Sequence, residues 1–451
     1  MFKITERLRL KYWRARSRIR NIRCPYALRA AKRYVELHLS LLIGSSAEKT
    51  NTGEPRLALF AWLFPPLISG GVYRPTALVR YAAMADWKVN VIAGPTPYKS
   101  SAAGIYLLGQ IPSSVTITRV LEYPSRPFWL PRLDGGFIHG VEGYLQAIAL
   151  LDSAPPTVVM ASGPPFHNFV AAYLTARRYG ARLVLEYRDE WTQTPFDFVK
   201  WGNNDQRWEE RCLRQADLVI FTTESQRQHL IRYYSFLDDG KCAVVPNGWE
   251  PADVPLRLSN SHPKDESRIV LTFAGNLGDH TLPGPFLDTL QDALVASPEL
   301  RQRLRLQFFG QKSECALEQV KRFRFQEILE LIDVVPKPEA FQAMRDANAL
   351  LILNTPSFER YMPGKLYEYL ASGTPVLVYG IGGEIDHTVT ELDAGPIIPE
   401  NNAELLRHTI VNISSWDMQA KRDKRDAWLA RHTRKHLSRE LLGHLNNLIR
   451  A

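Results

Sequence analysis

Apolar positions along this chain fall into two alternating patterns. Short continuous apolar runs occupy residues 57–63, 158–161 and 269–274, and each is followed closely by a turn rich in glycine or proline. Such runs are typical of strands buried on both faces of a parallel sheet. Between them, apolar residues recur every three or four positions, which indicates amphipathic helices. This alternation predicts α/β domains built on parallel sheets.

The clearest helix and strand lie within residues 363–379. Pro363 and Gly364 begin the helix, because proline suits a first helical turn, where its missing N–H costs nothing. Gly373 ends the helix, Pro375 prevents its continuation, and a short apolar strand follows. The buried stripe of this helix consists of Leu366, Tyr367, Leu370 and Ala371.

Two charged residues, Lys365 and Glu368, lie on the opposite face of this helix. A helix N-terminus is a natural phosphate site, and a cation beside it strengthens the attraction for anions. A sugar nucleotide would offer its pyrophosphate to Lys365 and its ribose hydroxyls to Glu368. The alternative is an ordinary surface ion pair between residues three positions apart.

The length of the chain predicts more than one domain. At 451 residues it is too long for one ordinary core and suggests two domains of roughly 200 residues. The stretch 249–266, rich in proline, serine, asparagine and charge, is the expected interdomain linker. The first domain is then 51–248 and the second 267–415, followed by C-terminal helices at 416–451 and preceded by an N-terminal arm at 1–50.

The basic charge is concentrated in the arm. Residues 1–33 hold twelve Lys or Arg and one acid, a net charge of +11, whereas the whole chain carries +9, so residues 34–451 carry −2. Apolar residues recur at helical spacing from Ile4 to Ile22, with Trp13 at the edge of the stripe. A basic amphipathic helix of this kind suits an anionic membrane surface. A disordered basic tail, a nucleic-acid-binding arm and a mitochondrial transit peptide are the alternatives.

The composition is that of an ordinary globular enzyme, with 45% hydrophobic and 23% charged residues. The four cysteines lie far apart, without metal-ligand spacing, as expected in a reducing cytoplasm. No apolar run reaches the roughly 18 residues of a membrane-spanning helix. We therefore expect a cytoplasmic protein.

The segment 371–376, Ala-Ser-Gly-Thr-Pro-Val, resembles the turn that follows the donor-site helix of glycosyltransferase family 4 enzymes. The preceding Pro-Gly-Lys-Leu-Tyr-Glu-Tyr-Leu-Ala is similar to a subgroup that builds bacterial surface polysaccharides. Pro-Asn-Gly at 246–248 is similar to the turn that ends the first domain of many such enzymes. The resemblance covers roughly residues 57–450. It implies the GT-B fold, in which two Rossmann-like parallel-sheet domains face a central cleft and the last helix returns to the first domain.

The resemblance also implies a donor site shared by both domains. In it, backbone amides of a glycine-rich loop approach the donor phosphates, Lys365 stabilises the leaving group and Glu368 holds the ribose. The implied donor-binding residues are Gly70, Gly71, Gly275, Asn276, Pro363, Gly364, Lys365 and Glu368. For the paired glycines alone, a simple tight turn is the alternative.

Two departures from the family pattern affect this donor site. Arg360 stands where the family usually has a first glutamate, and Glu359 is one residue out of register. Asn276 stands where an arginine is usual, and residues 277–287 contain no Lys or Arg. The charge facing the pyrophosphate would then come from Lys365, the helix N-terminus and Lys312.

The loops at 162–167 and 187–192 resemble the acceptor-side loops of the same subgroup. By this resemblance His167 and Asp189 are candidates to polarise an acceptor hydroxyl, and Arg188 could bind a phosphate. With Lys365, these are the candidate catalytic residues. The alternatives are a helix-entry hydrogen bond for His167 and a structural ion pair for Arg188 and Asp189.

Together with these features, the resemblance implies a retaining glycosyltransferase. It would move a sugar from a nucleotide-diphosphate donor to a hydroxyl of a lipid-linked or polysaccharide acceptor, with no metal and no cofactor. It would lie peripherally on the inner face of the cell membrane, bound through residues 1–33, and we expect no nucleic-acid partner. The alternatives are a sugar-nucleotide epimerase of the same fold and a non-catalytic scaffold in polysaccharide assembly.

Overall fold

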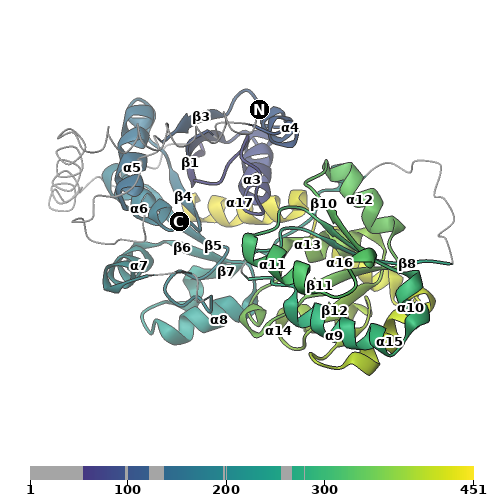
Figure 1. The fold of residues 1–451 in the computed structure, drawn as a ribbon. Coiled ribbons are helices and arrows are strands. Elements are labelled where there is room, and N and C mark those ends of the chain that lie inside the picture. Colours follow the sequence, from purple (N-terminus) through teal and green to yellow (C-terminus); the bar gives the residue numbers. More distant parts are fainter. Residues whose placement is uncertain are drawn as a thin grey trace, which may run out of the picture.

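The protein consists of two α/β units side by side, each with a parallel sheet between layers of helices (Figure 1). The computed structural model describes residues 54–96, 100–120, 137–196, 199, 201–254, 267–278 and 280–450. The predicted arm at 1–50 lies outside the described residues, as does the part of the predicted linker at 255–266. The predicted fold class, two Rossmann-like parallel-sheet domains, is confirmed for the described chain.

The first domain contains a seven-stranded sheet in the order β3-β2-β1-β4-β5-β6-β7, and every neighbouring pair is parallel. Its strands are β1 (Arg56–Ala61), β2 (Lys88–Ala93), β3 (Thr116–Arg119), β4 (Val158–Gly163), β5 (Arg182–Tyr187), β6 (Leu218–Phe221) and β7 (Cys242–Val244). Its helices are α3 (Tyr73–Met84), α4 (Ala102–Gly109), α5 (Phe137–Leu151), α6 (His167–Tyr179), α7 (Asn203–Gln215) and α8 (Glu224–Tyr233).

The second domain contains a six-stranded parallel sheet in the order β10-β9-β8-β11-β12-β13. Its strands are β8 (Ile269–Ala274), β9 (Leu304–Phe309), β10 (Leu329–Ile332), β11 (Ala349–Leu353), β12 (Val376–Tyr379) and β13 (Ile397–Ile398). Its helices are α9 (Gly284–Val295), α10 (Pro298–Arg303), α11 (Glu314–Arg322), α12 (Lys337–Asp346), α13 (Gly364–Ser372), α14 (Gly383–Leu392), α15 (Ala403–Asn412) and α16 (Arg422–Arg431).

The strands carry continuous apolar runs because both faces of each sheet are covered. In β1, Ala58 and Phe60 pack in one core with α5 and α6, whereas Leu57 and Leu59 pack in another with α3. In the second sheet, α9, α11 and α15 cover one face and α12, α13, α14 and α16 the other. Most side chains of the inner strands are therefore removed from water, whereas the edge strands β3 and β10 keep exposed side chains.

The last helix, α17 (Arg434–Arg450), leaves the second domain and lies along the first (Figure 1). Its residues Leu437, Leu441 and Leu445 enter the same core as Leu57 and Leu59 of β1. The first domain is therefore completed by a segment that follows the second domain in the sequence.

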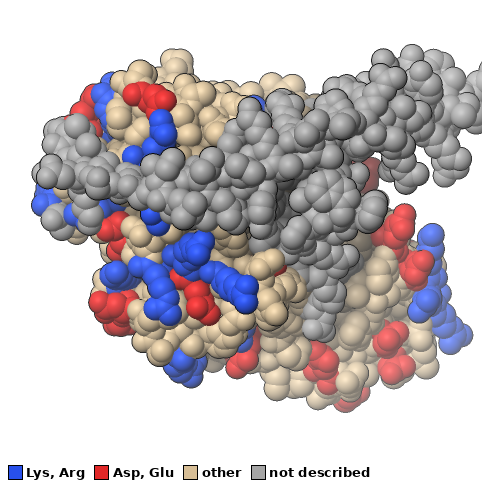
Figure 2. Space-filling model, turned by 90° about the vertical axis from the view of Figure 1, so that its left-hand side faces the viewer, with Lys and Arg blue, Asp and Glu red and all other residues tan. Residues whose placement is uncertain are grey.

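The described surface carries mixed charge. On the face shown in Figure 2, acidic and basic side chains are interspersed. No helix in the described ranges is long and apolar enough to cross a membrane.

Candidate active site

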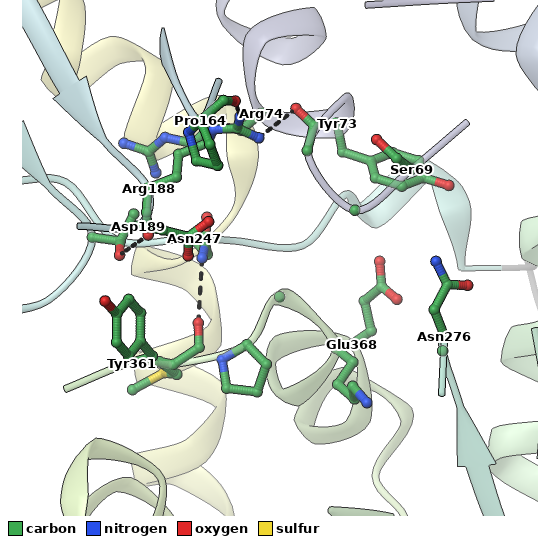
Figure 3. A pocket seen from close by; sticks show the side chains of 18 of the residues that line it. Ser69, Tyr73, Arg74, Pro164, Arg188, Asp189, Asn247, Asn276, Tyr361 and Glu368 are labelled. Atoms are coloured by element: carbon green, nitrogen blue, oxygen red, sulfur yellow. Dashed lines mark hydrogen bonds between the residues drawn. The ribbon is translucent and has the colours of Figure 1, made fainter. Parts of the chain in front are cut away.

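A cleft of about 790 Å³ lies between the two domains. Its walls are the loops at the carboxyl ends of both sheets, the first turn of α13 and the start of α17 (Figure 3). Loops at these strand ends are where α/β sheets bind ligands. The cleft is therefore the candidate active site.

Helix α13 presents its N-terminus to the cleft through Pro363, Gly364 and Lys365. The helix ends where the sequence predicts, at Gly373, whose φ of +78° is a left-handed conformation that glycine adopts without strain. The Lys365 Nζ lies 3.7 Å from the centroid of the Phe273 ring. Among the described residues, no hydrogen bond or ion pair engages this ammonium group. Burial lowers the pKa of Lys365 to about 7.

Lys365 and Glu368 do not pair with one another. The buried Glu368 carboxylate instead accepts hydrogen bonds from Lys337 of α12 at 2.5 Å and from Arg434 of α17 at 3.5 Å. Burial by itself raises the pKa of Glu368, but the charges of Lys337 and Arg434 outweigh it, so the pKa lies below its ordinary value. Glu368 therefore stays ionised. The surface-ion-pair alternative for this helix is wrong.

Tyr73, at the start of α3, completes this cluster from the first domain. Its ring centroid lies 4.7 Å from the Lys337 Nζ and 5.1 Å from the Arg434 guanidinium carbon. Arg434 also pairs with Asp253 at 3.3 Å. The sequence did not predict this set of site residues, because they belong to no local motif and only the fold brings them near Glu368. They are Tyr73, Asp253, Lys337 and Arg434.

Arg188 holds two loops of the first domain together. Its Nε donates to the Gly163 carbonyl at 3.2 Å, its Nη1 to the Gly71 carbonyl at 2.9 Å and its Nη2 to the Pro164 carbonyl. A Cβ at Gly71 would lie 2.1 Å from this Nη1, so any side chain there would displace the guanidinium. The guanidinium therefore fixes the position of the Gly70–Gly71 loop. Arg188 also lines the cleft, so its contact with a phosphate stays a prediction.

Lys365 lies against the second glycine loop. A Cβ at Gly275 would lie 3.3 Å from the Lys365 Nζ, and Gly275 has a φ of +150°. The neighbouring Asn276 lines the cleft and accepts a hydrogen bond from the Gln311 backbone N–H at 3.2 Å. Contrary to the prediction, Lys312 does not line the cleft, and its Nζ donates to the carbonyl of Ile332 at the end of β10.

The two acceptor candidates lie in different places. Asp189 lines the cleft, and burial raises its pKa against the opposing charge of Arg188. His167 does not line it. Its ring packs 4.5 Å from Trp62 and 5.5 Å from His139, and burial lowers its pKa to about 3. The prediction that His167 faces the acceptor is corrected, because α6 begins at this residue and turns its ring into the domain.

A buried carboxylate supports the loop that carries Asp189. Glu209 of α7 accepts hydrogen bonds from the Thr192 backbone N–H at 3.1 Å and from the hydroxyls of Tyr187 and Tyr234 at 3.0 Å each. Burial raises the pKa of Glu209 to about 7. In the sequence Glu209 is only an acidic residue on an expected helix, so this role could not be predicted.

Comparison with models of known protein families shows to which family the chain belongs. Residues 69–248 match the model of a glycosyl transferase 4-like domain, and residues 268–415 match that of glycosyl transferases group 1. The chain belongs to glycosyltransferase family 4. The family predicted from the 371–376 segment is thereby confirmed.

The curated relatives of this family 4 chain are distant. The D-inositol 3-phosphate glycosyltransferase of Nocardioides sp. is 26% identical over 225 residues, 45% of this chain and 48% of the relative. That of Saccharomonospora viridis is 25% identical over 240 residues, 51% of this chain and 54% of the relative. The chain thus spans about half the length of the curated relatives it matches.

Solved structures agree with the GT-B fold of the family. A sucrose-phosphate synthase from Thermosynechococcus elongatus has a TM-score of 0.67 at 15% identity, covering 88% of this chain and 99% of that one. Anabaena Alr3699/HepE in complex with UDP has a TM-score of 0.59 at 15% identity, covering 87% and 100%. At this level of identity the likeness concerns the fold.

Proposed function

We propose that this protein transfers a sugar from a nucleotide-diphosphate donor to an acceptor hydroxyl, with retention of configuration at the sugar. The observation that carries the proposal is Lys365, a cation at a helix N-terminus in the cleft, with no anionic partner among the described residues. A diphosphate would supply the missing negative charge. As the bond to the sugar breaks, the ammonium and the helix end would stabilise the charge developing on the leaving group.

Glu368 is suited to hold the ribose of the donor. Both of its ion pairs use Oε1, which leaves Oε2 to accept hydrogen bonds from ribose hydroxyls. Lys337 and Arg434 keep the carboxylate ionised and fix its orientation. Asp189, on the opposite wall of the cleft, would polarise the acceptor hydroxyl.

For the acceptor we propose a lipid-linked or polysaccharide hydroxyl, in the assembly of a bacterial surface polysaccharide. The support comes from the Pro-Gly-Lys form of the donor helix and from the basic arm at 1–33, which would bring the cleft to an anionic membrane surface. The relatives named above act on an inositol phosphate, so the acceptor is the part of the proposal that most needs a direct test.

The test is a transfer assay with labelled nucleotide sugars, with and without acceptor. Lys365→Ala should lower turnover by at least about 100-fold, the scale of losing one charge-stabilising group. Lys312→Ala is the matched control and should keep wild-type turnover, because its Nζ donates to the Ile332 carbonyl.

Three outcomes contradict the proposal. Wild-type turnover in Lys365→Ala would show that Lys365 does not stabilise the leaving group, on which the proposal rests. Isomerisation of the donor sugar without acceptor identifies an epimerase. No calorimetric binding of any nucleotide diphosphate identifies a scaffold.

A further inference from the structure

Three consecutive residues of the second domain, Arg360, Tyr361 and Met362, are each bound by the first domain. The Arg360 carbonyl accepts a hydrogen bond from the Thr223 hydroxyl at 2.6 Å, and the Met362 carbonyl accepts one from Asn247 Nδ2 at 3.3 Å. This segment ends directly before the first turn of α13. The first domain therefore contacts the second domain directly before the N-terminus of α13, the expected donor helix.

Glu190 is the centre of these contacts. Its carboxylate accepts hydrogen bonds from Arg360 Nε at 2.8 Å, from Arg360 Nη2 at 2.6 Å and from the Tyr361 hydroxyl at 3.0 Å. Glu190 is 1% exposed. In the described part of the chain, every hydrogen-bond donor to this carboxylate comes from the other domain.

The geometry of this pair is that of a strong interaction. Two parallel hydrogen bonds between a guanidinium and a carboxylate stabilise the pair and also set the orientation of both groups. Because the carboxylate is buried, removal of one partner leaves an uncompensated charge away from water, whereas most surface pairs contribute little. The pair is therefore a contact that stabilises the arrangement of the two domains seen in the structure.

The pair also connects the two walls of the cleft. Glu190 follows Asp189, which lines the acceptor side, and Arg360 lies shortly before Lys365, which lines the donor side. A second contact joins the two domains, where Ser225 donates to the Glu384 carboxylate from its hydroxyl at 2.5 Å and its backbone N–H at 3.2 Å.

We propose that Glu190 and Arg360 are positioning residues that hold the acceptor loop and the donor helix together before any donor binds. The catalytic consequence of this inference rests on the proposed sugar transfer. The inference gives a physical reason for arginine at position 360, because a glutamate there would be repelled by Glu190. Glu359, the acidic residue next to Arg360 in the sequence, is exposed and does not line the cleft.

The test uses Glu190→Gln, Arg360→Gln and the reciprocal double variant Glu190→Arg with Arg360→Glu. Small-angle X-ray scattering without donor should show a larger radius of gyration for each single variant and recovery in the double variant. In transfer assays each single variant should lose at least about tenfold in kcat, the scale of breaking a buried charge pair. The donor dissociation constant should stay within about twofold, because Lys365 and Glu368 are untouched.

The matched control is Arg407→Gln. Arg407 pairs with Glu404 at the same 2.6 Å, but both residues are on α15, inside the second domain, where Glu404 is exposed and Arg407 is partly exposed. This variant should match the wild type in scattering and in kcat.

The inference is overturned if both single variants are as compact as the wild type, or if they keep its kcat. A folded double variant without any recovery overturns it as well, because a general loss of stability would then explain the single variants. Scattering needs no turnover, so it judges the pair even if the wild type transfers no sugar. A wild type that transfers no sugar would count against the proposed function and not against the role of the Glu190–Arg360 pair.

Discussion

Lys365 faces the cleft with an aromatic ring and a helix end as neighbours, and with no carboxylate among the described residues. Its pKa of about 7 means that near neutral pH the empty site holds a mixture of ammonium and neutral amine. A bound pyrophosphate favours the ammonium form and raises this pKa. Donor binding is therefore coupled to uptake of a proton.

The coupling predicts how donor affinity depends on pH. Below about pH 7 Lys365 is already charged, so affinity should be nearly constant; above it, binding must also protonate the amine. The affinity for a nucleotide sugar should then fall by up to about tenfold per pH unit. Calorimetry in buffers of different ionisation enthalpy measures the proton uptake, which Lys365→Ala should abolish. An affinity independent of pH from about 7 to 9 would contradict the coupling.

The sequence located Lys365 and Glu368 because helix caps and spacing are local signals. It could not supply Lys337 and Arg434, which lie 31 and 66 residues from Glu368 along the chain. It also placed His167 in the cleft, because the end of a strand predicts where a loop lies but not which way the first helical residue turns. At this scale, local chemistry was predictable and the orientation of side chains was not.

Among the elements, α17 has two roles. Its first residue, Arg434, reaches Glu368, and its leucines complete the core of the first domain. The apolar spacing of a helix predicts that it packs, but not against which partner. The return of α17 was implied by the family resemblance alone, whereas the buried strands followed from their apolar runs.

Leu445 tests the packing role of α17. It is fully buried in the core of the first domain, so Leu445→Ala should lower the free energy of unfolding by about 2–5 kcal/mol. Leu405 of α15 is 38% exposed, and Leu405→Ala should cost far less. Urea unfolding followed by tryptophan fluorescence compares the two variants. A loss for Leu445→Ala as small as that expected for Leu405→Ala would show that α17 adds little to the core.

At the scale of the whole molecule, the charge is divided between the arm and the body. Residues 1–33 carry +11, whereas the remainder of the chain carries −2. The face drawn in Figure 2 agrees with this division, because the acidic and basic side chains described there are interspersed. Any electrostatic attraction to an anionic membrane is therefore expected from the arm.

This division predicts that the full chain sediments with anionic vesicles, while a chain beginning at Glu54 does not. Each Lys or Arg near the membrane contributes about 1 kcal/mol, and salt screens the attraction over roughly 10 Å, so binding should weaken as salt is added. Competing DNA is the control, because nucleic-acid binding depends on salt as well. Equal sedimentation of both chains, or preference of the full chain for DNA, would contradict the membrane role.

The position of α17 also governs the order in which the protein can be assembled during translation. This helix is synthesised after every other described element, yet it covers one face of the sheet that is synthesised first. Domains usually fold in turn as they leave the ribosome. Here the earlier domain must wait, with Leu57 and Leu59 incompletely covered, until the later domain has emerged. A premature stop before residue 434 would therefore damage the half of the protein farthest from it in the sequence.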